Sequence, residues 1–134
     1  MPNAKVLLVD DDQELCCALA QVLAMYNFEA TTASTLPNAL NRIGSEKFDA
    51  VLLNLNMPGT ADHLTMVQAL RQANPKAVML VFSASPEAGD ISSARRLQAD
   101  EILVKPIPVS ELINVITQRL IVGPAAAPTR TAIA

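Results

Sequence analysis

The chain is poor in aromatic residues, which make up 3 % of its 134 positions, and it contains no tryptophan. A core must therefore be built from aliphatic side chains, and a hydrophobic content of 51 % supplies enough of them for one domain. Charged residues amount to only 17 %, which argues against a chain that is disordered throughout. These shortages favour one small folded domain with an aliphatic core.

Cysteine is equally scarce, because the sequence contains only the neighbours Cys16 and Cys17. Adjacent side chains on a helix point in different directions, so a disulfide between these two is not expected. The pair also lacks the spacing of metal ligands. We expect both residues to be buried thiols in a reducing compartment.

Long apolar runs and an excess of positive charge are also missing. No hydrophobic stretch approaches the roughly 18 residues that cross a membrane, and the N-terminal segment does not resemble a signal peptide. We therefore expect a cytoplasmic protein without membrane contact. The formal net charge is −3, which argues against direct binding of nucleic acid, because such binding needs a positive surface.

Five short apolar runs predict the strands of a sheet. Polar and apolar residues do not alternate within them, which is typical of parallel strands buried on both faces. The runs cover residues 6–9, 28–32, 50–53, 77–82 and 102–104.

Five further stretches space their apolar residues like one face of a helix. Thr35 is a suitable N-cap for the second of them, with Pro37 in the first turn and Gly44 at the end. Tyr26 and Val109 are expected on the inward faces of the first and the last helix. The predicted helices cover approximately residues 15–26, 35–44, 64–73, 87–98 and 109–120.

Alternation of strands and helices implies parallel strand pairing with right-handed crossovers. We therefore expect an α/β fold in three layers, with an open, doubly wound, five-stranded sheet over residues 1–122. Ligands of such sheets bind at the carboxyl ends of the strands, where the strand order reverses. Residues 123–134 contain small residues and two prolines, and we expect them to form a flexible tail or linker.

Polar residues follow four of the predicted strands. Asp10–Asp12 follow the first strand, Asn54 the third, Ser83 the fourth and Lys105 the fifth. Three consecutive acids could form a solvated loop that starts a helix, or they could hold a divalent cation such as magnesium. Lys105 could form an ordinary salt bridge or belong to the same site. The order of these groups favours one shared site.

At these positions the sequence resembles the receiver domain of two-component response regulators, over roughly residues 4–121. The resemblance rests on Val-Leu-Leu-Val-Asp-Asp-Asp at 6–12, Asn-Met-Pro at 56–58, Ser83-Ala84, Val-Lys-Pro at 104–106, and the intervals between them. It implies a flavodoxin-like fold with strand order 2-1-3-4-5 and a role in phosphorelay signal transduction.

The resemblance also implies roles for individual residues. Asp10 and Asp11 match the acidic pair that binds magnesium in the family, with the backbone of Asn56 as a further ligand. Ser83 and Lys105 match the hydroxyl and the amine that hold the phosphoryl group.

Asn54 occupies the position at which the family carries its phosphoacceptor aspartate. A neutral amide is a far poorer nucleophile than a carboxylate, so a stable aspartyl phosphate is not expected here. The lost negative charge should also weaken magnesium binding. The amide can instead donate to a neighbouring carboxylate and accept from Lys105, which would close the site without phosphate.

Ile102 is a second departure from the family pattern. Many receivers carry Tyr or Phe at this position, and that ring changes rotamer on activation. Isoleucine is stiff and has no polar tip, so activation through a rotating ring is not expected.

We therefore expect a phosphorylation-independent receiver that is not an enzyme and acts through its fourth helix, fifth strand and fifth helix. Its partner would be a sensor kinase, an output domain or a second copy in a homodimer. The alternative is a haloacid-dehalogenase-like phosphatase that uses Asp10 and Asp12, although Gln13 and Glu14 do not fit its motif. A nucleotide-binding domain is a third hypothesis, but the scattered glycines form no phosphate loop.

Overall fold

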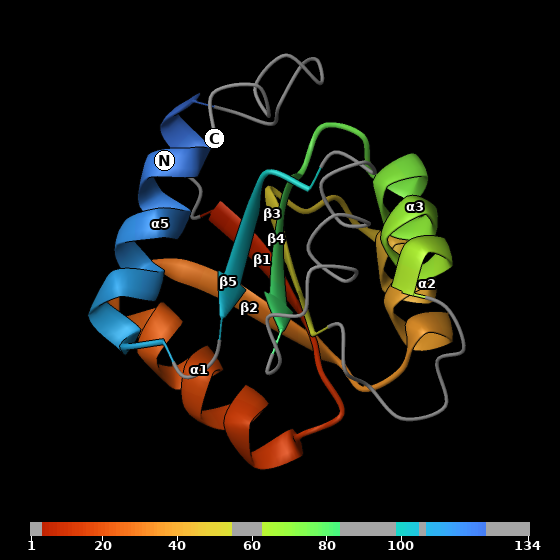
Figure 1. Ribbon diagram of the computed structural model, residues 1–134. Helices are drawn as coiled ribbons and strands as arrows, with labels where there is room; N and C mark the ends of the chain where they lie inside the picture. The colour runs from red at the N-terminus through yellow and green to blue at the C-terminus, as the bar shows by residue number, and fades with distance from the viewer. Residues whose placement is uncertain (1–3, 55–62, 84–98, 105–106, 123–134) are drawn as a thin grey trace.

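The computed structural model describes residues 4–54, 63–83, 99–104 and 107–122 (Figure 1). Within them, five strands form one parallel sheet in the order β2-β1-β3-β4-β5. The predicted α/β fold and its strand order are therefore confirmed. The predicted helix over 87–98 and the tail from residue 123 lie outside the described residues.

Each described element lies within a few residues of its predicted range. No helix among the described residues has both the length and the apolar composition that a membrane span requires.

The strands are β1 (Ala4–Val9), β2 (Phe28–Ala33), β3 (Ala50–Asn54), β4 (Val78–Ser83) and β5 (Glu101–Val104). The helices are α1 (Gln13–Met25), α2 (Leu36–Ser45), α3 (His63–Ala73) and α5 (Val109–Val122).

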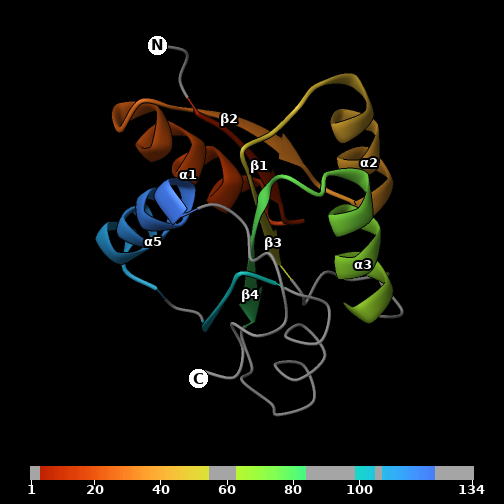
Figure 2. The same cartoon turned by 90° about the horizontal axis from the view of Figure 1, so that it is seen from above.

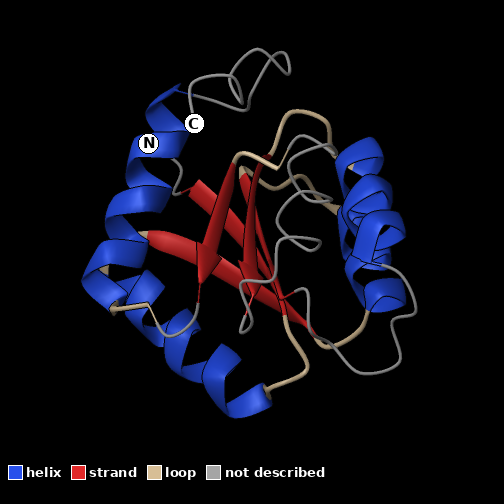
Figure 3. Cartoon of the chain, in the orientation of Figure 1, coloured by secondary structure: helices blue, strands red, loops and turns tan. Residues whose placement is uncertain are grey.

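The sheet is the middle of three layers (Figures 2 and 3). Helices α1 and α5 cover one face, and α2 and α3 cover the other. Successive strand residues point to opposite faces, so Val6 and Leu8 pack in the α1–α5 core, while Leu7 and Val9 pack in the α2–α3 core. Burial on both faces explains why the strands are apolar throughout.

Side-chain caps mark the beginnings of two helices. The Asp12 carboxylate accepts a hydrogen bond from the Leu15 amide at 3.0 Å, and the Thr35 hydroxyl accepts one from the Asn38 amide at 3.2 Å. The predicted Thr35 cap is therefore confirmed. Helix α2 ends at Ser45, one residue beyond the predicted end at Gly44.

Three predicted inward positions are wrong. Tyr26 follows the last residue of α1 and is 52 % exposed, while Val109 is the first residue of α5 and is 42 % exposed. Both lie at helix ends, where the inward face no longer contacts the sheet. Cys16 is buried as expected, but Cys17 is exposed, because one residue turns the side chain about 100° around the helix axis.

Truncation of a core residue tests this assignment of layers. Leu80 is fully buried in β4, so we expect Leu80→Ala to lower the free energy of unfolding by about 2–5 kcal/mol. Ile121 is 81 % exposed on α5, so Ile121→Ala should change it by less than about 0.5 kcal/mol. Urea unfolding followed by circular dichroism measures both. Equal effects of the two substitutions would contradict the assignment.

Candidate functional site

The pairing of the two central strands brings Asp10 and Asn54 together. Strands β1 and β3 are parallel neighbours in which Val9 lies opposite Leu53, so the next residues, Asp10 and Asn54, reach the same edge of the sheet. Strand β2 flanks β1 on the other side, so the strand order reverses between β1 and β3. This is the edge at which an open α/β sheet binds its ligands.

Asn54 and Asp10 are joined by a buried hydrogen bond. The Asn54 Nδ2 group donates to Asp10 Oδ1 at 3.1 Å, and the two residues are 6 % and 8 % exposed. The Asp12 amide donates to the same Asp10 oxygen at 3.0 Å. A buried carboxylate needs such donors, because burial removes its hydration. The opposite orientation of the amide would place two oxygens against each other, so this network selects the observed one.

The backbone of Asp10 is held from two further sides. Its amide donates to the Ala33 carbonyl at 3.0 Å, which ties the end of β1 to the end of β2. Its carbonyl accepts from the Cys16 thiol at 3.6 Å. The sequence did not indicate this thiol contact, because a cysteine within a helix carries no pattern that distinguishes it from any other small buried residue. The position of the Asp10 carboxylate is therefore set by β2, β3 and α1 together.

The three consecutive acids have different environments. Asp10 is buried, whereas Asp11 and Asp12 are exposed. Asp12 caps α1, which agrees with the hypothesis that these acids start a helix.

The carboxylates expected to bind magnesium already make contacts within the protein. Within the described residues, no group of three or more His, Cys, Asp or Glu side chains is arranged to hold a metal ion. Magnesium prefers octahedral coordination by oxygen ligands, but one oxygen of Asp10 already accepts from Asn54 and Asp12, and the Asp12 carboxylate caps a helix. The predicted backbone ligand Asn56 lies outside the described residues.

The other predicted site residues are placed only in part. Ser83 is the last residue of β4 and pairs with Val104, while Asn54 pairs with Phe82, so Ser83 lies at the same sheet edge as Asn54. Lys105 lies outside the described residues. Ile102 is partly buried against the α2–α3 core, which fits a stiff aliphatic side chain that fills space.

The phosphatase hypothesis gains no support from this geometry. It requires Asp10 as a nucleophile and Asp12 as an acid near the same reacting atom. Asp10 is buried and bonded to Asn54, while Asp12 is exposed and bonded to the first turn of α1. The two carboxylates therefore serve different structural roles.

Comparison with known proteins identifies the family of this chain. Residues 6–117 match the response regulator receiver domain. The chain is 34 % identical over 111 residues to the transcriptional regulatory protein PrrA of Mycobacterium leprae, covering 83 % of this chain and 47 % of PrrA. It is also 34 % identical over 112 residues to the transcriptional activator PfeR of Pseudomonas aeruginosa, covering 84 % of this chain and 36 % of PfeR. The chain thus spans less than half the length of these two relatives.

Solved structures agree on the fold. A receiver domain from Methanospirillum hungatei superimposes with a TM-score of 0.83 at 20 % identity, over 88 % of this chain and 94 % of the other. A response regulator from Burkholderia pseudomallei, solved with a phosphorylated aspartic acid, gives 0.80 at 23 % identity, over 88 % and 69 %. Together with the sheet order and the match over residues 6–117, these similarities show that the chain belongs to the response regulator receiver domains of two-component signalling.

Proposed function

We propose that this receiver domain signals without an aspartyl phosphate and acts through contacts with other proteins in the cytoplasm. The observation that carries the proposal is the hydrogen bond from Asn54 Nδ2 to Asp10 Oδ1 at 3.1 Å. It places an amide, and no carboxylate, beside the buried acid at the ligand-binding edge of the sheet.

The chemistry of the amide supports this proposal. Formation of an acyl phosphate requires a carboxylate oxygen that attacks phosphorus, and an amide nitrogen or oxygen does not supply an equivalent nucleophile at neutral pH. The Asn54 nitrogen also donates to Asp10, so its hydrogen is already directed at an acceptor. The position matched to the phosphoacceptor therefore acts as a hydrogen-bond donor.

The same contact supports a site that remains closed without a bound ion. Two N–H groups donate to the buried Asp10 carboxylate, and such donors favour its ionised form. We propose that Ser83 and Lys105 complete this network, as their matches in the family complete the phosphoryl pocket. Magnesium would then bind weakly through Asp10 and Asp11, since it must displace the amide first.

Exposed apolar side chains support a partner surface on α5. Val109 and Ile121 of this helix are two of the four exposed large hydrophobic residues in the part of the chain that the structure describes. We propose that a sensor kinase, an output domain or a second copy binds through β5, α5 and the segment predicted as the fourth helix.

The relatives support a division between receiver and output. Both PrrA and PfeR are transcriptional regulators, and the part matched by this chain is less than half of each. We propose that residues 1–122 form the receiver, that residues 123–134 form a linker or tail, and that any output activity belongs to another domain or a partner.

Treatment with phosphodonors tests the central claim. We expect no covalent phosphate and no conformational change when the protein is incubated with acetyl phosphate or beryllofluoride, because residue 54 offers no carboxylate. Intact-mass spectrometry and NMR spectra of the backbone amides measure both effects. Asn54→Asp treated in parallel shows that the conditions permit reaction. A stoichiometric adduct on the unmodified protein would refute the proposal.

Asn54→Asp should also change the affinity for magnesium. The substitution adds a carboxylate next to Asp10, so the two acids repel each other until a cation neutralises them. We expect magnesium to bind at least about tenfold more tightly than before, which corresponds to roughly 1.4 kcal/mol. Isothermal titration calorimetry of both proteins gives the comparison. Equal affinities would mean that Asn54 does not control the cation site.

Asn54→Ala tests the contribution of the hydrogen bond to stability. Loss of the amide leaves the buried Asp10 carboxylate with one donor fewer, and we expect the free energy of unfolding to fall by about 1–3 kcal/mol. Asn41→Ala is the matched control, because Asn41 is exposed on α2. Its effect should stay within about 0.5 kcal/mol in urea unfolding. A negligible loss for Asn54→Ala would show that the contact does not stabilise the site.

A further inference from the structure

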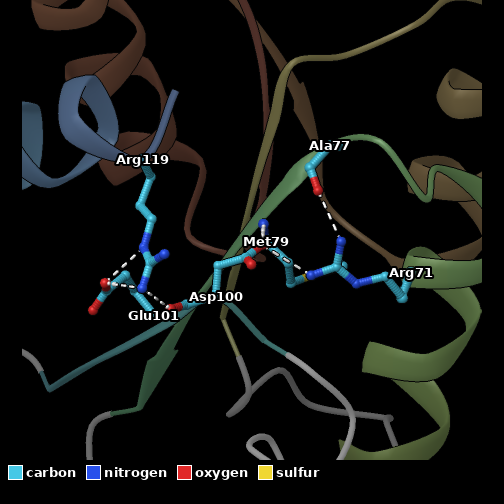
Figure 4. A network of polar contacts seen from close by, with 6 residues as sticks. All are labelled: Arg71, Ala77, Met79, Asp100, Glu101 and Arg119. Carbon is cyan, nitrogen blue, oxygen red and sulfur yellow. Dashed lines mark hydrogen bonds and ion pairs between the residues drawn. The ribbon is translucent and has the colours of Figure 1, made fainter. Parts of the chain in front are cut away.

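A second polar cluster is drawn in Figure 4. Asn54 ends β3, whereas this cluster lies where β4 and β5 begin, so the two are at opposite ends of the parallel sheet. The cluster surrounds the beginnings of β4 and β5, where Met79 pairs with the backbone of Asp100. Arg71 reaches it from α3 and Arg119 from α5. The sequence did not indicate this cluster, because an arginine in the last turn of a helix is ordinary and an acid before a strand is common.

Asp100 is the centre of the cluster. Its side chain is fully buried, and Oδ2 accepts from Arg71 Nη2 at 2.9 Å and from the Met79 amide at 2.7 Å. The Asp100 amide donates to the Met79 carbonyl at 2.8 Å. Arg71 also donates through Nη1 to the Ala77 carbonyl at 2.9 Å. The carboxylate therefore ties α3 to the beginning of β4.

Arg119 binds the backbone of the same residue. Its Nη2 group donates to the Asp100 carbonyl at 2.8 Å, and its Nε group donates to Glu101 Oε2 at 2.7 Å. The side chains of Arg71 and Arg119 are only 14 % and 12 % exposed, so solvent screens these contacts weakly. The positive charges of Arg71 and Arg119 are matched by the negative charges of Asp100 and Glu101. A charge that is removed from water needs such a partner.

The two arginines come from helices on opposite faces of the sheet (Figures 2 and 4). Arg71 holds the carboxylate of Asp100 and Arg119 holds its carbonyl. Both acceptors belong to one residue, so a shift of the Asp100 backbone changes both contacts together. The short edge strand β5 begins directly after this residue and contains only four residues.

We propose that Asp100 couples α3 to α5 across the sheet, so that a change at the α5–β5 surface is transmitted to α3. A partner whose carboxylate draws Arg119 away would release the Asp100 carbonyl and alter the contact between the Asp100 carboxylate and Arg71. Such coupling is an interaction free energy between two sites. It rests on the proposed partner surface of β5 and α5, but not on the proposed absence of phosphorylation, because no residue of the Asn54 site takes part in it.

A double-mutant cycle tests the coupling. Arg71→Met, Arg119→Met and the double variant are compared with the unmodified chain by urea unfolding. We expect the unfolding constant of the double variant to differ by at least about threefold from the product of the single effects, as residues in one network do. Arg119→Met combined with Lys5→Gln is the control, because Lys5 pairs with Glu46 at 3.6 Å, outside the cluster, and should be additive.

A second measurement separates transmission from a purely local contribution to stability. In Arg119→Met alone, we expect the NMR signal of the Arg71 Nε–H group to shift and the last-turn amides of α3 to exchange faster with solvent. Lys5→Gln should leave both unchanged. An additive cycle, or unchanged α3 signals in a folded Arg119→Met protein, would overturn the proposal. This arm needs no variant of Arg71, so it decides the question even if Arg71→Met fails to fold.

Discussion

The candidate site depends on the hydrogen bond between Asn54 and Asp10. The parallel pairing of β1 with β3 places the two residues side by side, and burial makes the contact necessary for the carboxylate. A donor at residue 54 stabilises an ionised Asp10, whereas a carboxylate there would repel it. In general, an amide is a poorer nucleophile than a carboxylate and adds no negative charge for a cation to neutralise.

The two ends of the sheet carry different polar networks. The carboxyl ends hold Asp10 and Asn54, while the amino ends of β4 and β5 hold Asp100 between two arginines. Strand β5 runs from the second network toward the edge of the first. It begins directly after Asp100, and Lys105 is the next residue after it in the sequence. A polar group buried at each end restricts how the strands can slide, because every alternative register would leave a charge without its donors.

Much of the fold could be predicted because its signals are local. Apolar runs without alternation indicated the buried strands, and the Thr35 cap indicated the start of α2. Predictions failed where a helix end mattered, as at Tyr26 and Val109, because helical spacing does not show where contact with the sheet stops. Cys17 was misplaced for a related reason, since neighbouring residues of a helix face different surroundings.

The sequence by itself determined the class of fold, the strand-end positions of the polar residues and the amide at residue 54. These follow from the order of residue types along the chain, because parallel strands bring their ends to common edges. Only the tertiary structure decided that Asn54 donates to Asp10 and that Asp100 joins α3 to α5. These contacts depend on distances between residues far apart in the chain, which strand register and helix packing establish together.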